Sequence, residues 1–536
     1  MVKKKLLPVI AILIVVAFLA GGCGTGEQDQ GEGAPTETTD EIKQLIVAVD
    51  PDYNTFDPGL AYELYGMMVL NPVYETLVHF VDTIDVPKYG IAESHEVSED
   101  GLVYTFKLRP GINFASGNPL TSEDVKWSIE RMISLDGNGA FMAKDIASIE
   151  APDDETVIIT LTEPDASFLV KLTYNAFAAI DSALAMEHGA SNDAQNDTAK
   201  LWFDNNSAGS GPYMIESYDP AVEVVLVRND NYWGEAPYYD RISLKSIADP
   251  GTQLMMLQKG DIDIAFNLGP EHVKQLSGVE GVDILSAQSM TISFLLMNRD
   301  PAVGGPMANP DVQKAVRLAL DYKEIQALAG EGAVTPVAPF QIGFLGTVPP
   351  RDPNTARDVE AAQALMEQAG YPEGFSVTLE VPTVSVEGLD LPTLAQKIQN
   401  DLLDIGITTE IVTSDIMVAL DPYRSGQQAF SLWYWGPDYP DPNNQLAFLP
   451  GNSVGLRANW TTEMNPELAE LGRKTAVEVD PDIRAQYLEE IQMMMDDDTA
   501  FAMLLQFARQ FAVRDNIEGA DYIDPYRIDL RQVREK

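Results

Sequence analysis

The alternation of helix-like and strand-like segments in the second half of the chain constrains its fold more than any other feature. Amphipathic helices are predicted over residues 311–320, 356–369, 394–403 and 481–495. Short apolar strands are predicted between them, at residues 376–381, 408–412 and 429–435. Such alternation predicts an α/β fold with a largely parallel sheet covered by helices, in which a ligand binds beyond the carboxyl ends of the strands.

The first half of the chain also mixes strands and helices. Strands are predicted at residues 44–49, 102–108, 222–227, 262–266 and 292–297. Helices are predicted at residues 119–132 and 253–258. In the strand at 102–108, Tyr104, Phe106 and Leu108 share one face, which predicts a half-buried strand. Thr121 and Asp124 have the spacing of a capping box at the start of the next helix.

The N-terminus has the composition of an export signal. Three lysines precede an apolar run at 6–20, and two glycines lead into Cys23, the single cysteine of the chain, which excludes an internal disulfide. The junction resembles a bacterial lipobox, in which the cysteine is lipidated, although Ala20 stands where leucine is usual. The alternative is a secretory signal with an incidental cysteine. We predict a signal peptide over 1–22, a flexible acidic tether over 23–41, and lipid anchoring outside the cytoplasm, at the cell surface or in the periplasm.

Charge and composition exclude several classes of function. The 536 residues are 45% apolar, enough for two to four domains with buried cores. The 82 acidic and 35 basic residues give a formal net charge of −47, which excludes nucleic acid as a partner because such binding requires a basic surface. The four histidines lack metal-ligand spacing, and no nucleophile elbow, P-loop or dinucleotide motif is present. We expect no catalytic residue, metal or cofactor.

A ligand site is predicted in residues 432–451, which read LWYWGPDYPDPNNQLAFLPG. The strand ends at a Gly-Pro pair and Asp438 follows on a proline-rich loop, so an apolar wall meets one fixed negative charge that can orient a cationic ligand group. The alternative is an aspartate that caps a structural turn. Trp435 is the predicted wall residue. It shares a strand face with Trp433, and Tyr434 faces the other way, with core packing as an equal alternative for these aromatics.

Several motifs together resemble the family 5 extracellular solute-binding proteins, which serve ABC importers of peptides, nickel and related solutes. The motifs are AESHEVSEDGLVYTFKLRPGINFASGNPLTSEDVKWSIERM (92–132), NPVYETL (71–77), GSGPY (209–213), RNDNYW (228–233), LQKGDID (257–263), MN (297–298) with the helix at 310–320, and PDYPDPNN (437–444). The resemblance runs from about residue 45 to the C-terminus. Two departures stand out. His95 replaces a usual tryptophan, which we interpret as a packing change. Residues 382–387 lack the arginine with which dipeptide-binding relatives often clamp the ligand carboxylate.

The resemblance implies a type II periplasmic-binding-protein-like fold, with two α/β lobes around a ligand cleft and an extra α+β domain. The implied lobe I combines 42–74, 206–286 and 513–536, the extra domain spans 75–205, and lobe II spans 287–512. In peptide-binding members, the acid at the loop position of Asp438 binds the ligand ammonium group. Further ligand-binding residues are expected next to it and behind the first strand: Gly436, Tyr53, Asn54 and Thr55.

The implied function is that of the substrate-binding component of an ABC importer. Hinge closure would capture a solute, most simply a short peptide, and the loaded monomer would deliver it to permease subunits driven by a cytoplasmic ATPase. The same scaffold also serves oligosaccharides and nickel complexes, and a sugar would stack on Trp435. Two other classes stay open: a secreted hydrolase, and a peptide-sensing or chaperone-like surface protein that is not coupled to import.

Overall fold

The computed structural model describes residues 42–51, 53–81, 83–524 and 526–536. The predicted signal peptide, the lipidation site Cys23 and the tether therefore lie outside the described residues. Residues Ile42–Lys536 form one compact unit. Among its described residues, none of the helices combines the length and the apolar character that crossing a bilayer requires.

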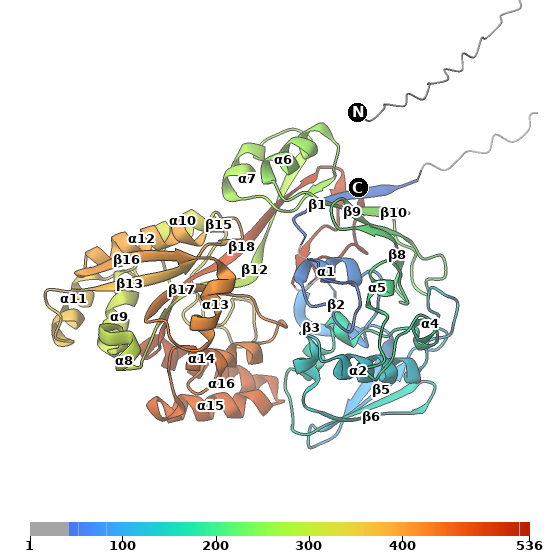
Figure 1. Cartoon of the computed structure of the whole chain (residues 1–536), viewed down its shortest axis with the longest axis horizontal. Coiled ribbons are helices and arrows are strands. Elements are labelled where there is room, and N and C mark those ends of the chain that lie inside the picture. Colours follow the sequence, from blue (N-terminus) through green and yellow to red (C-terminus); the bar gives the residue numbers. More distant parts are fainter. Residues whose placement is uncertain (1–41, 52, 82, 525) are drawn as a thin grey trace, which may run out of the picture. The chain divides into compact units, whose positions relative to one another are not determined.

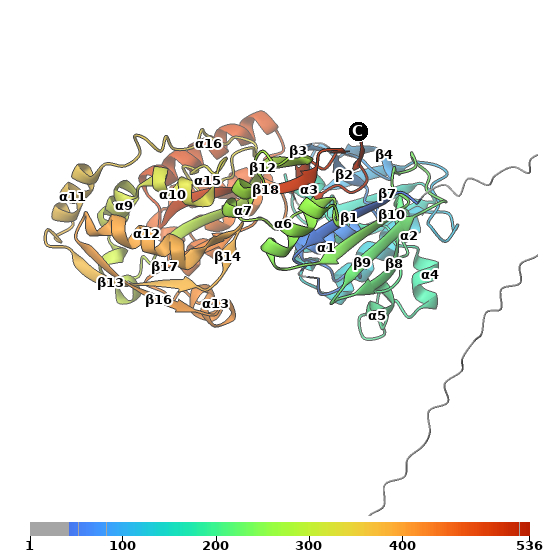
Figure 2. The ribbon, with the colours of Figure 1, turned by 90° about the horizontal axis from the view of Figure 1, so that it is seen from above.

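A ten-stranded sheet runs through this unit (Figure 1). Its strands, in spatial order, are β16 (Ile407–Ser414), β13 (Phe375–Pro382), β17 (Phe430–Trp435), β12 (Val282–Met297), β18 (Phe501–Arg514), β11 (Ile264–Ala265), β1 (Gln44–Val49), β10 (Arg241–Ser246), β9 (Glu223–Arg228) and β8 (Tyr213–Asp219). Figure 2 shows β1, β10, β9 and β8 side by side.

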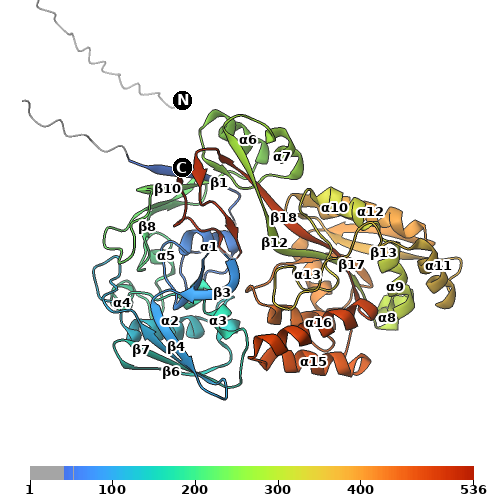
Figure 3. The same cartoon turned by 180° about the vertical axis from the view of Figure 1, so that it is seen from behind.

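The prediction of a largely parallel sheet is wrong. Strand β13 pairs in parallel with β16 and β17, and β1 pairs in parallel with β10 and β11. The other five pairings of the sheet are antiparallel. The reason is that β12 and β18, its two longest strands, run against each other and against their outer neighbours, so they join two small parallel groups through an antiparallel ribbon (Figure 3). The register of this ribbon breaks between Gln288 and Ile292.

Helices cover both faces of the half of the sheet that contains β13, β16 and β17. One face packs on α9 (Pro310–Ala319), α10 (Tyr322–Ala329), α11 (Val359–Gln368) and α12 (Leu391–Leu403). The opposite face packs on α13 (Ile416–Arg424), α14 (Ser453–Arg457), α15 (Pro466–Val477) and α16 (Pro481–Asp497). Side chains alternate between these cores, as the period of a strand requires: Leu432 is buried on the first face and Trp433 on the second. The predicted helices of this half are confirmed to within a few residues.

A second sheet has the order β4 (Ala92–Val97), β5 (Val103–Leu108), β7 (Thr156–Leu161) and β6 (Ile146–Asp153). Tyr104, Phe106 and Leu108 are buried on one face of β5, as predicted. They pack with α2 (Ser122–Leu135), whose capping box between Thr121 and Asp124 is confirmed. This apolar cluster also receives Tyr439, from the loop that follows β17.

Shorter strands and helices connect these parts. The two-stranded pairs are β2 (Val78–Val81) with β3 (Thr83–Tyr89), β14 (Ser385–Val386) with β15 (Leu389–Asp390), β19 (Ile517–Glu518) with β22 (Arg534–Glu535), and β20 (Tyr522–Ile523) with β21 (Arg527–Ile528). The remaining α-helices are α1 (Leu64–Leu70), α3 (Phe168–Lys171), α4 (Ser182–Glu187), α5 (Lys200–Phe203), α6 (Pro250–Lys259), α7 (Pro270–Leu276) and α8 (Pro301–Gly304).

Candidate ligand-binding site

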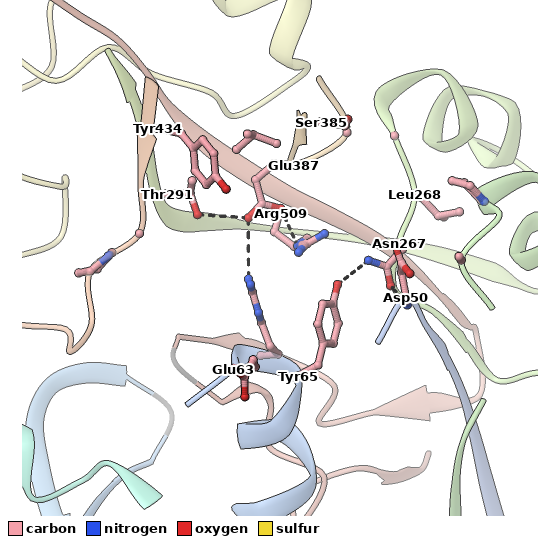
Figure 4. A pocket seen from close by; sticks show the side chains of 18 of the residues that line it. Asp50, Glu63, Tyr65, Asn267, Leu268, Thr291, Ser385, Glu387, Tyr434 and Arg509 are labelled. Atoms are coloured by element: carbon pink, nitrogen blue, oxygen red, sulfur yellow. Dashed lines mark hydrogen bonds and ion pairs between the residues drawn. The ribbon is translucent and has the colours of Figure 1, made fainter. Parts of the chain in front are cut away.

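A cavity of about 770 Å³ lies where the ends of several strands meet (Figure 4). Its wall is formed by the ends of β1 and β17, the segment that leads into α1, the loop before α7, the β14–β15 hairpin, and single residues of β12, β18 and β21. This volume is typical of a site for a small molecule or a short peptide. The cavity thus gathers residues that are up to several hundred positions apart in the sequence.

Asp438 lies in this wall, on the loop after β17. One carboxylate oxygen accepts a hydrogen bond from the Tyr62 hydroxyl, and the other accepts one from the Asn444 side-chain amide at 3.0 Å. Burial, and then the neighbouring Asp438 carboxylate, raise the pKa of Tyr62, so its phenol stays protonated and donates. Both donors are neutral, so they orient the carboxylate without compensating its negative charge.

Two contacts of Asp441 hold the loop that carries Asp438. Asp441 caps the short 3₁₀ helix Pro442–Phe448 by accepting the backbone N–H of Asn443 at 2.8 Å. The same carboxylate forms an ion pair with Arg484 of α16, and both side chains are only 7% exposed. Asp441 therefore fixes the loop, whereas Asp438 faces the cavity.

A charged cluster occupies the wall formed by the β14–β15 hairpin. Glu387 lies 2.9 Å from Arg509 Nε and 3.8 Å from Arg527 Nη1. It accepts hydrogen bonds from the hydroxyl of Thr291 at 3.4 Å (Figure 4) and from that of Ser289 at 3.1 Å. The Glu387 side chain is 5% exposed, and the two arginines are 9% and 8% exposed. Burial by itself raises the pKa of Glu387, but the two guanidinium groups outweigh burial and hold this pKa below its usual value.

The backbone at Glu387 is unusual. Its φ is 48° and that of Gly388 is 83°, so the two-residue turn of the hairpin has positive φ at both positions. Glycine and asparagine favour such positions, whereas glutamate pays a steric penalty there. The ion pairs and hydrogen bonds of the carboxylate offset this local strain and hold the side chain against the cavity wall.

The predicted aromatic wall is placed differently. Gly436 lines the cavity next to Asp438, but Trp435 is not among the lining residues, and Tyr434 takes that place. Trp435 points to the core on the opposite face of β17, where its ring packs against Phe448 with centroids 5.6 Å apart. The reason is the alternation of the strand: the face that continues from Trp433 packs on helices, and the face of Tyr434 opens into the cavity.

The three residues predicted behind the first strand lie outside the cavity wall. Thr55 is buried and donates to Asp204 at 2.5 Å, and the Tyr53 ring packs on Phe56 with centroids 5.1 Å apart. Asn54 is exposed, and its amide donates to Glu63, a residue that lines the cavity. The segment therefore supports the wall from behind.

Sequence reasoning missed several wall residues, above all Glu387, Arg509, Arg527, Tyr62 and Glu63. One signal was available. Gln506 and Arg509 interrupt the apolar strand β18, and a polar residue inside a buried strand needs a partner or a function. As for metals, the described residues contain no group of three or more histidine, cysteine, aspartate or glutamate side chains that could hold an ion.

Comparison with known proteins gives consistent matches. A model of the bacterial extracellular solute-binding proteins, family 5 (middle), matches residues 86–455. The chain is 27% identical over 488 residues to the probable D,D-dipeptide-binding periplasmic protein DdpA of Escherichia coli (strain K12), covering 89% of this chain and 90% of the relative. It is 29% identical over 381 residues to the glutathione-binding protein GsiB of Escherichia coli O1:K1 / APEC, covering 70% of each.

Solved structures show the same fold. The periplasmic binding protein DppA of Helicobacter pylori in complex with the peptide STSA aligns with a TM-score of 0.73 and 24% identity, covering 92% of this chain and 98% of that chain. HbpA2 of Haemophilus parasuis aligns with a TM-score of 0.80 and 22% identity, covering 92% of this chain and 100% of that chain. The predicted type II periplasmic-binding-protein-like fold is confirmed.

Proposed function

Because the chain belongs to the family 5 bacterial extracellular solute-binding proteins, we propose that it captures short peptides in the cavity described above. The protein is the substrate-binding component of an ABC importer, and this component delivers its solute to a membrane permease. It is not an enzyme. The proposal concerns the solute and the residues that hold it.

The Asp438 carboxylate is the observation that carries this proposal. It faces the cavity, and its neutral donors Tyr62 and Asn444 leave its charge available for a cation. A carboxylate has about four lone-pair positions, so two remain for the N–H groups of a ligand ammonium. Enclosing an unpaired ammonium is costly, and a fixed carboxylate removes that cost. We propose that Asp438 binds the peptide N-terminus and that Gly436 and Tyr434 form the wall beside it.

Two further observations favour a peptide over a sugar. Charged groups of both signs, Asp438 and Arg509, line the cavity, which suits a zwitterion better than a neutral ligand. Trp435, on which a sugar would stack, lies outside the cavity wall and packs against Phe448 at the edge of a core. Two of the relatives named above are a dipeptide-binding and a glutathione-binding protein, and both of those ligands are short peptides.

We also propose the predicted arrangement in two lobes and an extra domain, with lobe I at 42–74, 206–286 and 513–536, the extra domain at 75–205 and lobe II at 287–512. The cavity wall draws residues from both proposed lobes, as a hinge-closing site requires. Lipidation of Cys23 would tether this monomeric body to the membrane outside the cytoplasm.

Mass spectrometry of the full chain tests the proposal. The protein is purified from its host without added ligand, and its mass is compared under native and denaturing conditions. We expect bound masses that resolve into short peptides. A single sugar mass in the same experiment would exclude the peptide proposal.

Asp438→Asn tests the residue assignment. Removing the charge while keeping the shape strands the ligand ammonium and should weaken peptide binding by about 2–5 kcal/mol, measured by titration calorimetry. Glu410→Gln is the matched control, because Glu410 is an exposed acid on β16 outside the cavity wall. Equal affinities for Asp438→Asn and the control would remove Asp438 from the site.

A further inference from the structure

We infer that Arg509 binds the anionic end of the ligand, positioned for this role by Glu387; the inference rests on the peptide function proposed above. A peptide has two charged ends, and Asp438 accounts for one of them. The residues after β13 that often supply a carboxylate clamp in dipeptide-binding relatives contain no basic side chain here, and they place Glu387 at the cavity instead.

Arg509 has the unused hydrogen-bonding capacity of an anion receptor. Its guanidinium carries five N–H donors, and Nε is directed at Glu387, 2.9 Å away. Within the described residues, its two terminal nitrogens make no hydrogen bond, although the side chain is 9% exposed and lines the cavity. Because Arg509 lines the cavity, these terminal donors are available to a ligand there. Two parallel N–H groups on one guanidinium match a carboxylate.

Arg527 differs from Arg509 because its contacts are with the protein. Its Nη1 donates to the Tyr522 hydroxyl at 2.6 Å and lies 3.8 Å from both Asp524 and Glu387. Two carboxylates therefore surround Arg527, whereas Arg509 pairs with Glu387 alone. Arg527 also has donors without a partner among the described residues, but two carboxylates already compensate its charge, so Arg509 is the arginine whose charge is left more available to a further anion.

Glu387 acts as a positioning residue. Its contact with Nε fixes one edge of the Arg509 guanidinium, and the Phe266 ring lies 4.9 Å from the guanidinium carbon. With that edge engaged, the terminal nitrogens are the part of the group left for a ligand. The positive φ of Glu387 shows that the hairpin turn holds this carboxylate in place at a steric cost.

Strand geometry relates this end of the site to Asp438. Strand β12 lies between β17 and β18 in the sheet, so the strands that lead to Asp438 and Arg509 are roughly 10 Å apart. An extended chain spans about 3.3–3.6 Å per residue, so about three residues cover this lateral spacing, and the displacement of Arg509 along β18 adds to it, because Arg509 pairs with Ala287 and Trp435 with Ile292. The inference therefore specifies a short peptide with a free C-terminal carboxylate.

A competition between acids and amides tests the inference. The full chain is offered an equimolar mixture of randomised di- and tripeptides, half as free acids and half as C-terminal amides, and the retained peptides are quantified by mass spectrometry after denaturation. We expect wild-type protein to enrich the acids at least about tenfold. In the double variant Glu387→Gln/Arg509→Gln, which leaves no stranded carboxylate, the ratio of acid to amide should fall to about one.

Two controls separate recognition from folding. Arg299→Gln removes a buried arginine that pairs with Asp498 outside the cavity wall, and its ratio should equal that of wild type. Arg509→Lys keeps the charge but not the paired donors, and its ratio should lie between those of wild type and the double variant. If wild type retains acids and amides equally, or if the double variant keeps the acid preference, the inference is wrong and the peptide function stands. If wild type retains neither, both are wrong.

Discussion

Arg131 and Arg509 are both buried arginines that pair with carboxylates, and they differ in how many of their donors are used. Arg131 on α2 donates Nη1–H and Nη2–H to Asp57 at 2.7 and 2.6 Å and Nε–H to Asp197 at 2.8 Å, and its side chain is fully buried. Arg509 has one carboxylate at Nε and terminal nitrogens that face a cavity. A saturated arginine stabilises the fold, whereas an unsaturated one beside a cavity indicates a binding site.

The first prediction separates the two arginines by stability and has the largest expected effect. Arg131→Gln strands two buried carboxylates and should lower the free energy of unfolding by about 3–5 kcal/mol, measured by urea denaturation. Arg509→Gln should cost only about 1–2 kcal/mol, because Ser289, Thr291 and Arg527 still contact Glu387. Equal losses of stability in the two variants would show that Arg509 stabilises the fold as much as Arg131 does.

The second prediction applies the same division to the two faces of β17. Trp435→Ala removes a partly buried ring that packs on the core beside Phe448, so we expect a loss of about 2–3 kcal/mol in stability and unchanged peptide affinity. Tyr434→Ala opens the cavity wall, so we expect peptide affinity to fall by about 1 kcal/mol. Both variants are measured by calorimetric titration and by urea denaturation. If Trp435→Ala weakens peptide binding and Tyr434→Ala does not, Trp435 lines the binding site after all.

The third prediction concerns pH and is the smallest. The pKa of Glu387 lies below its ordinary value of 4.5 in the folded protein, so its ionised form stabilises the fold above that pH. This contribution is lost as the pH falls below 4.5 through the folded-state pKa. Glu387→Gln should therefore cost about 1 kcal/mol in urea denaturation at neutral pH and almost nothing at strongly acidic pH. A cost that does not change with pH would show that the charge of Glu387 contributes nothing to stability.

The sequence predicted those parts of the fold that depend on local patterns. Strand β5 and helix α2 follow from side-chain alternation and from a capping box, which involve residues a few positions apart. The pairing of β12 with β18 depends on residues more than two hundred positions apart, so the helix–strand alternation suggested a more parallel sheet than the chain forms. Local periodicity contains no information on which distant strands become neighbours.

Local sequence patterns likewise predicted one part of the candidate site and not the other. The placement of Asp438 at the cavity follows from a strand that ends at a Gly-Pro pair, together with a motif of the family. The Glu387–Arg509 pair joins a hairpin turn to a strand 122 positions later, and no local pattern connects them. Only the polar residues inside the otherwise apolar strand β18, Gln506, Arg509 and Gln510, suggested that this strand does more than form a core.

The break in the β12–β18 ribbon has a mechanical consequence. Gln288 pairs with Ala508 and Ile292 with Gln506, and the residues between Gln288 and Ile292 have no ladder partner. A ribbon flexes at least cost where its ladder is already interrupted, because no backbone hydrogen bond has to break there. Ser289 and Thr291, which hold Glu387, lie within this interruption. Flexing the ribbon would therefore shift Glu387, the counter-ion of Arg509, so the proposed hinge and the proposed contact with the ligand's anionic end involve the same few residues.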